Sequence, residues 1–264
     1  MRLFVDTHAH LGDPAFDADR DCVFARARDA GVTRIVEIAD HPDEWARAVA
    51  IARARPESTR CALGLHPYYA DRFDADFPAR LRAALDAAPC AAAIGEIGLD
   101  FAKSSVSRET QRAAFKALAA AGRDWAIPLV IHCRDAYDDL LTILRELFTA
   151  PPTGRRFHGV VHCFSGTPEQ ARACAGLGFA LGADGPVTYK KNDALREAFR
   201  STGPGCAVLE TDSPYLPPQT ARGRRNEPSA IAEIAAKLAE VWSISVDDVA
   251  RITSRNAADL FAWP

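Results

Sequence analysis

Short apolar runs alternate with longer amphipathic stretches along the whole chain. Runs of this kind are typical of buried strands, and apolar residues at helical spacing are typical of helices that cover them. The apolar runs predict strands over residues 3–10, 32–38, 59–65, 91–97, 128–132, 159–162, 179–182 and 206–210. The amphipathic stretches predict helices over residues 19–30, 42–54, 77–88, 107–121, 137–148, 167–178, 193–200, 229–242 and 246–261.

A strand followed by a helix, repeated in this way, implies parallel strands. Eight such units in 264 residues favour a single (β/α)₈ TIM barrel over an open doubly wound sheet, because a barrel domain has about 250 residues. No linker or low-complexity tract divides the chain, so residues 1–264 are predicted to form one domain with an extra C-terminal helix. The seventh predicted strand is weak and argues less strongly than the others for a closed ring, and a distorted barrel is the alternative.

Composition excludes several classes of protein. Apolar residues make up 48% and charged residues 25% of the chain, which is the balance of a folded globular protein. No apolar run approaches the roughly 18 residues that span a bilayer, and the first strand leaves no room for a secretory signal, so a cytoplasmic protein without membrane contact is predicted. A net charge of −3 argues against a nonspecific clamp on long duplex DNA. No apolar seam stands out, and a monomer is expected.

The seven cysteines are scattered and form no Cys-x-x-Cys pair, which predicts reduced thiols rather than a zinc cluster. Cys133 and Cys163 each follow a histidine at the end of a strand. Side chains alternate along a strand, so both thiols are expected on the opposite face from the histidine, among the helices.

Candidate chemistry gathers where the predicted strands end. His8 and His10 point to one face of the first strand, since they are two residues apart. Five of the seven histidines fall at strand ends, where the active sites of barrels lie. The other two, His41 and His158, are interpreted as structural because one lies near a helix start and the other at the entry end of its strand.

Two carboxylates join the histidines at this edge, and the set is large enough to hold two divalent ions about 3.5 to 4 Å apart. The predicted ligands are His8, His10, Glu96, His132, His162 and Asp212. Glu96 is the expected bridge between the ions. Such a centre favours an anionic substrate, and a phosphodiester fits it. The set is compatible with Mg, Mn or Zn. Asp6 and Glu210 lie one step deeper on their strands, and a supporting role is favoured for both over direct ligation.

Seven motifs together resemble the TatD-like family of metal-dependent deoxyribonucleases. The motifs are DTHAH at 6–10, GLHP at 64–67, GEIGLD at 95–100, IHCR at 131–134, HCFSG at 162–166, ETDSPYL at 210–216 and RGRRNEP at 222–228. The resemblance runs nearly from end to end. It implies a TIM-barrel deoxyribonuclease, with a 3′–5′ exonuclease on single-stranded DNA ends as the finer expectation.

The resemblance also implies roles for individual residues. Asp212, Glu96 and His66 are expected to be catalytic, with His66 near the phosphate of the substrate. Contacts with DNA are expected from His66, Arg134, Arg222, Arg225 and Asn226. Tyr68, Tyr69, Phe101 and Tyr215 also follow these motifs and could stack on bases, although packing is the favoured role for each of them alone.

Two alternatives stay open at this point. The same ions could hydrolyse a carboxylic ester or an amide, for example in a D-aminoacyl-tRNA deacylase, because a bridging hydroxide attacks either centre. A binding module that has lost catalysis is disfavoured, since no predicted ligand position is substituted.

Overall fold

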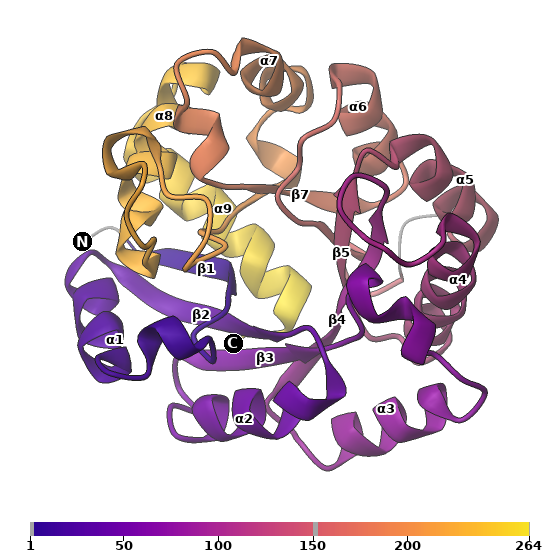
Figure 1. The fold of residues 1–264 in the computed structure, drawn as a ribbon. Coiled ribbons are helices and arrows are strands. Elements are labelled where there is room, and N and C mark those ends of the chain that lie inside the picture. Colours follow the sequence, from indigo (N-terminus) through magenta and orange to yellow (C-terminus); the bar gives the residue numbers. More distant parts are fainter. Residues whose placement is uncertain (1–2, 150–152, 264) are drawn as a thin grey trace.

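The fold is a ring of eight parallel strands with helices packed around its outside, and Figure 1 shows this arrangement. The structure is a computed structural model that describes residues 3–149 and 153–263. Its strands are β1 (Phe4–Ala9), β2 (Val32–Ala39), β3 (Thr59–Leu63), β4 (Ala91–Asp100), β5 (Leu129–Arg134), β6 (Gly159–Val161), β7 (Phe179–Ala183) and β8 (Ala207–Leu209). Each strand pairs in parallel with the next in the chain.

The α-helices and short 3₁₀ helices connect the strands at the expected places. The α-helices are α1 (Arg20–Asp29), α2 (Pro42–Arg53), α3 (Phe77–Asp86), α4 (Arg108–Asp124), α5 (Tyr137–Leu147), α6 (Pro168–Gly176), α7 (Asp193–Thr202), α8 (Ile231–Trp242) and α9 (Val246–Phe261). The 3₁₀ helices are η1 (Pro14–Phe16), η2 (Pro67–Arg72), η3 (Gly185–Thr188), η4 (Pro204–Cys206), η5 (Gln219–Ala221) and η6 (Pro228–Ala230). At the start of α6, Thr167 and Gln170 form a capping box.

The first and last strands meet through the residues that follow them. Ala9 and Ser213 form a parallel bridge, the Asp212 amide donates to the His8 carbonyl at 2.9 Å, and the His10 amide donates to the Ser213 carbonyl at 2.8 Å. These bonds close the ring, and the predicted (β/α)₈ barrel is confirmed. The weak seventh strand does not interrupt the ring, because β7 pairs in unbroken register with both neighbours. The irregularities lie instead in the pairing of β1 with β2 and of β4 with its neighbours.

The core has two parts. The larger lies between the strands and the surrounding helices. The smaller fills the floor of the barrel, where the strands contribute small side chains. These inward residues include Val5, Val36, Ala62, Ala93, Val130, Val160, Ala180 and Val208.

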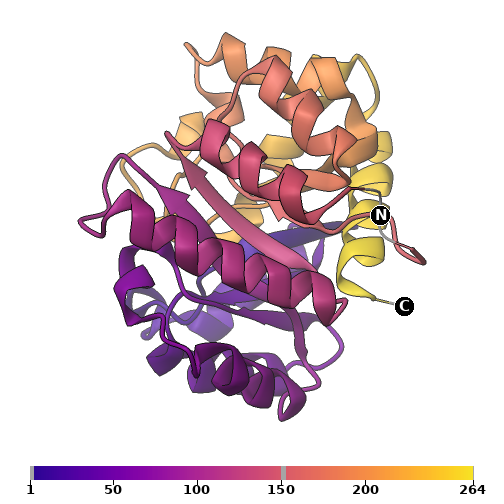
Figure 2. The same cartoon turned by 90° about the vertical axis from the view of Figure 1, so that its right-hand side faces the viewer.

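Helix α9 closes this floor from below. Its residues Ala257, Leu260 and Phe261 pack in the same cluster as the inward strand residues. Ser254 donates to the Leu3 carbonyl before β1, and Asn256 donates to the Ala207 carbonyl at the start of β8, so the helix lies at the amino ends of the strands. Figure 1 shows α9 behind the strands, and Figure 2 shows it at one side of the molecule. The opposite end of the barrel is left open for the site. None of the helices within residues 3–149 and 153–263 is both long and apolar enough to cross a bilayer.

Replacing Leu260 in α9 by alanine should lower the free energy of unfolding by about 2 to 5 kcal/mol, because it opens a cavity under the barrel. Leu260 is only 2% exposed. Urea unfolding of the Leu260→Ala protein measures the loss. The exposed neighbour Asp259 provides the control, and Asp259→Ala should stay within about 0.5 kcal/mol of the unmutated protein. Equal effects of the two changes would contradict the role given to α9.

Candidate metal centre

All six predicted ligands meet at the carboxyl ends of the strands, in a space a few ångströms across. Strands β1, β4 and β5 carry His8, Glu96 and His132 directly. His10, His162 and Asp212 lie in the first residues after β1, β6 and β8. Alternation along the strands explains much of this placement, because His132 and His162 stand two residues beyond the inward Val130 and Val160.

The Glu96 carboxylate lies at the middle of the group, and its two oxygens face different histidines. Oε1 is 2.6 Å from His162 Nε2 and 2.7 Å from His132 Nδ1. Oε2 is 3.2 Å from His8 Nε2 and 4.0 Å from His10 Nε2. One carboxylate therefore separates two sets of imidazole nitrogens, as a bridging ligand would.

Asp212 completes the set around the first strand. Its Oδ1 is 3.3 Å from His10 Nε2 and 3.6 Å from His8 Nε2, and these two nitrogens are 3.1 Å apart. The backbone of Asp212 adopts φ 55°, a left-handed conformation that aspartate tolerates better than most residues. Because β8 ends at Leu209, the position of this carboxylate is set by a turn and not by strand alternation.

Asp100 determines which nitrogen of His132 faces the centre. Its Oδ2 is 3.2 Å from His132 Nε2 and accepts a hydrogen bond from it, which leaves Nδ1 facing Glu96 Oε1 at 2.7 Å. The Asp100 Oδ1 in turn accepts bonds from the amides of Ala102 and Lys103. This arrangement, in which a carboxylate orients an imidazole, is common around metal sites.

In neutral His66, the nitrogen that faces the centre is the one that carries the proton. Its Nδ1 caps η2 by accepting a hydrogen bond from the Tyr68 amide at 3.2 Å. When the ring is neutral, the proton therefore lies on Nε2, which is 3.6 Å from Glu96 Oε1. His66 consequently faces the centre as a hydrogen-bond donor.

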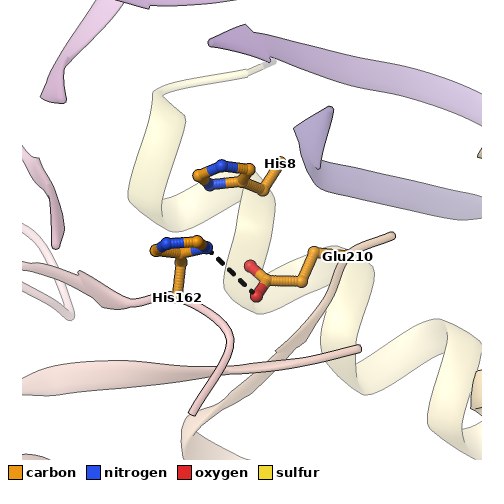
Figure 3. Close-up of side chains that lie close together, drawn as sticks. All are labelled: His8, His162 and Glu210. Atoms are coloured by element: carbon orange, nitrogen blue, oxygen red, sulfur yellow. Dashed lines mark ion pairs between the residues drawn. The ribbon is translucent and has the colours of Figure 1, made fainter. Parts of the chain in front are cut away.

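Below the centre lies a second, fully buried layer. Figure 3 shows the stacked rings of His8 and His162, with centroids 3.9 Å apart, and the Glu210 carboxylate beside His162. Glu210 Oε1 accepts a bond from the Cys163 amide and is 3.8 Å from His162 Nδ1. Gly182 leaves room for it, because a Cβ there would lie 2.4 Å from the Glu210 oxygens. Glu210 thus lies deeper than Asp212, as the sequence suggested.

Asp6 is equally buried and holds the closing turn. Its carboxylate accepts bonds from the Thr211 amide at 3.0 Å, from the Thr211 hydroxyl at 2.6 Å and from the His8 amide at 3.3 Å. Burial raises the pKa of Asp6 to about 7. The supporting position predicted for Asp6 agrees with these contacts.

The imidazoles divide by charge. Burial lowers the pKa of His8 to about 4 and the pKa of His66 to about 3, so both are neutral. Burial acts in the same direction on His132, but Asp100 and Glu96 outweigh it and raise its pKa to about 9. For His10, Asp40 and Asp212 overcome burial and raise the pKa well above its usual value. The pKa of Glu96 is held well below its usual range, against burial, by the surrounding histidines.

The donor set fits divalent metal ions. Two groups of possible ligand atoms illustrate this. One consists of His8, His10 and Asp212, and the other of His66, Glu96 and His132. Within each group, all ligand atoms lie within 4.8 Å of one another. His132 Nδ1 and His162 Nε2 lie 2.7 and 2.6 Å from the same Glu96 oxygen, so a cation bound there would have two ring nitrogens and a carboxylate within reach. Imidazole and carboxylate are the ligands that Zn and Mn accept.

Sequence reasoning missed three carboxylates at this edge. Asp40 follows β2 and has a buried, unpartnered Oδ1, and its Oδ2 is 4.0 Å from His10 Nδ1. Asp184 follows β7 and accepts a bond from Cys163 Sγ at 2.7 Å. Asp100 belongs to a recognised motif but had no assigned role. Each stands within three residues after a predicted strand, and this position at the carboxyl ends of the strands was the signal that could have identified them.

The prediction for Cys133 is confirmed, whereas the prediction for Cys163 is wrong. Cys133 is buried among the residues between strands and helices. Cys163 lies beside the centre, and its thiol is grouped with His162 and Asp212 as a possible ligand. Strand β6 ends at Val161 and Cys163 has φ 44°, so alternation does not extend to this residue.

The predicted DNA-contacting residues fall into two groups. Arg134 is exposed at the end of β5, and Arg222 is exposed over the Tyr189 ring. Arg225 is engaged elsewhere, since its guanidinium pairs with Asp19 and Glu227.

Asn226 is buried and acts within the loop between β8 and α8. Its side-chain amide donates to the carbonyls of Thr211 and Tyr215, both at 2.8 Å. These bonds fix the turn that carries Asp212.

The structural interpretation of the remaining histidines agrees with their contacts. His41 caps α2 by accepting a bond from the Asp43 amide. His158 packs against Phe148 and Phe179, with ring centroids 4.6 and 5.7 Å away.

Comparisons with known proteins agree with one another. The family model described as "TatD related DNase" matches residues 5–262. A protein of Bacillus subtilis (strain 168) named "Uncharacterized metal-dependent hydrolase YabD" is 33% identical, over 98% of this chain and 99% of that protein. A protein of Erwinia billingiae named "3'-5' ssDNA/RNA exonuclease TatD" is 34% identical, over 98% of this chain and 99% of that one. The crystal structure of the TatD homologue YjjV from Escherichia coli K12 superposes with a TM-score of 0.89 at 30% identity, covering 99% of this chain and 98% of that one.

Cys133 and Cys163 should respond differently to replacement. Cys163→Ala removes the donor to the buried Asp184 carboxylate and should lower the free energy of unfolding by about 1 to 3 kcal/mol. Cys163→Ser keeps a donor and should retain most of the stability of the unmutated protein. Cys133→Ala should lower the free energy of unfolding by about 1 kcal/mol, with or without a reducing agent in the buffer. Cys22 is exposed, and Cys22→Ala serves as the control. Chemical unfolding with chelator present measures each loss. If serine and alanine at position 163 were equally destabilising, the bond to Asp184 would not matter.

Proposed function

Since the chain belongs to the family of TatD-related DNases, we propose that it removes nucleotides from the 3′ end of single-stranded DNA by metal-dependent hydrolysis of phosphodiester bonds. The name of the Erwinia relative supports the polarity and the strand preference. The observation that carries the proposal is the Glu96 carboxylate, which offers one oxygen to each of two histidine sets. A cytoplasmic location and a monomeric state stay predictions from the sequence.

Two divalent ions, Mg, Mn or Zn, are proposed to lie on either side of Glu96. One would be held by His8, His10 and Asp212, and the other by His132 and His162. Bound there, the ions would polarise the phosphodiester and acidify a water molecule. The first position is supported by the grouping of His8, His10 and Asp212, and the second by the closeness of His132 and His162 to one Glu96 oxygen.

The chain's own groups then divide the work of hydrolysis. Burial tends to raise the pKa of Asp212, but the hydrogen bond and the charge of His10 lower it, so its carboxylate is ionised. It is proposed to orient the attacking water and to take its proton. Water oxygen forms a bond to phosphorus, the bond from phosphorus to the leaving sugar oxygen breaks, and that oxygen takes up a proton from solvent. His66, with its proton on Nε2, is placed to donate a hydrogen bond to a phosphate oxygen.

Arg134 and Arg222 are proposed to contact the DNA backbone, because both guanidinium groups are exposed on the loops around the site. Arg225 and Asn226 are proposed to act on DNA through the loop they hold, since their side chains are occupied by protein partners.

The polarity and the substrate class can be tested in one experiment. Protein purified without chelator is incubated with oligonucleotides labelled at the 3′ or the 5′ end, and with a charged tRNA. Stepwise shortening of the 5′-labelled strand and immediate release of the 3′ label are expected. Release of amino acid from tRNA without any cleavage of DNA would favour the deacylase instead.

Glu96→Gln should abolish hydrolysis while the barrel stays folded, because glutamine cannot balance two cations and the side chain adds little to the core. The assay is cleavage of a labelled oligonucleotide at saturating metal, with circular dichroism to check folding. Activity within about tenfold of the unmutated protein, a barrier change below roughly 1.4 kcal/mol, would contradict the bridging role.

Asp212→Asn should reduce kcat by at least about 10²-fold and weaken metal affinity, because it keeps the shape and removes the charge that accepts the proton. Glu210→Gln should have a smaller effect, since Glu210 lies below the rings and faces the Cys163 amide. Steady-state kinetics over a metal titration measure both. A large loss for Glu210→Gln with near-normal kcat for Asp212→Asn would reverse the two assignments.

A further inference from the structure

Large apolar side chains are exposed mainly around the mouth of the site. Among residues 3–149 and 153–263, the large hydrophobic residues classed as exposed are Leu3, Tyr68, Tyr69, Tyr215 and Leu216. All but Leu3 lie in the segments after β3 and β8, which carry His66 and Asp212. Exposed aromatic rings that gather in one place mark a binding surface more often than a packing defect.

Tyr215 and Tyr68 lie on different sides of the Glu96 carboxylate. Tyr215 packs edge-on against His10, with ring centroids 5.7 Å apart, and His10 Nε2 is 4.0 Å from Glu96 Oε2. Tyr68 packs edge-on against His66 at 4.4 Å, and His66 Nε2 is 3.6 Å from Glu96 Oε1. A phosphodiester held at Glu96 would therefore have one tyrosine beside each of its two ester arms.

Both rings are held in place by their hydroxyl groups. The Tyr215 hydroxyl donates to Asp13 Oδ2 at 2.9 Å, and the Tyr68 hydroxyl donates to Asp100 Oδ2 at 3.2 Å. The rings nevertheless stay 51% and 39% exposed. A ring that is fixed at its edge and open on its surface loses little freedom when a flat group stacks on it.

The other aromatic residues of these segments do not share this arrangement. Tyr69 packs against His41, away from the histidines of the centre, with centroids 4.8 Å apart. Phe101 is covered by the guanidinium groups of Arg108 and Arg112.

We propose that Tyr68 and Tyr215 are two nucleobase-binding surfaces, one for each nucleoside that flanks the scissile phosphate. The proposal rests on the proposed nuclease function and specifies the substrate as a strand whose two flanking bases are unstacked. Stacking on an aromatic ring accepts any base, so these surfaces select single strands without selecting sequence. A base inside a duplex would first have to leave its stack to reach either ring.

The test measures kcat and KM of the metal-loaded protein on a single-stranded oligonucleotide and on methyl p-nitrophenyl phosphate, a phosphodiester without a base. Tyr68→Ala and Tyr215→Ala should each raise KM for the oligonucleotide by roughly 10-fold or more, the usual effect of losing one stacked base. Hydrolysis of the small diester should not change. Tyr68→Phe and Tyr215→Phe keep the rings and should stay within about threefold, and Tyr69→Ala is the matched control.

Substrates with one abasic residue on either side of the scissile bond complete the test. The tyrosine that stacks on the missing base should lose its effect on that substrate only, as in a double-mutant cycle. Equal losses on the small diester, or tyrosine effects that persist on both abasic strands, would overturn the proposal.

A failure of the proposed function would look different, because no phosphodiester would then be hydrolysed. In that case, the base-binding role can still be tested by measuring the binding of a labelled phosphorothioate oligonucleotide by fluorescence anisotropy. Binding that is equal for the unmutated and alanine proteins would overturn the base-binding role.

Discussion

Glu96 is an anionic carboxylate almost completely removed from water, with 2% of its surface exposed. A buried charge without partners is very costly, so the barrel must supply cations or their equivalents on all sides. It does so with imidazoles from the ends of β1, β3, β5 and β6. Imidazoles can hold either protons or metal ions, and His10 and His132 have raised pKa values that match this demand. The need to balance one carboxylate thus explains why the histidines of separate strands converge.

Regular strands alone could not build this arrangement. Alternation places His132 and His162 inward, but Asp212 and Cys163 reach the centre through left-handed turns with φ 55° and φ 44°. The pairing of β1 with β2 is also irregular between Asp6 and Ala9, where His8 lies. Below them, small residues and α9 form an apolar floor. Packing at the floor therefore stabilises one end of the barrel, and turns position polar groups at the other.

The hydrophobic pattern predicted the fold well because each apolar run had to be buried and each amphipathic stretch had to cover it. The ligand set followed from the ends of those runs. Cys163 was misplaced because no pattern of side chains shows that β6 ends at Val161. Asp100 and Arg225 could not be understood from sequence for a related reason. Their roles depend on partners far along the chain, His132 and Asp19, and a single sequence does not reveal such pairs.

The loop after β8 links the metal centre with the proposed base-binding surface. Asp212 and Tyr215 stand three residues apart, and the Tyr215 amide donates to the Asp212 carbonyl at 2.8 Å. Asn226 holds the carbonyls on both sides of this segment, and Arg225 ties the end of the loop to Asp19. A shift of the loop would therefore move together the carboxylate that is proposed to take the proton and the ring that is proposed to receive a base. Rigid anchoring of this single loop would keep the two proposed roles in register.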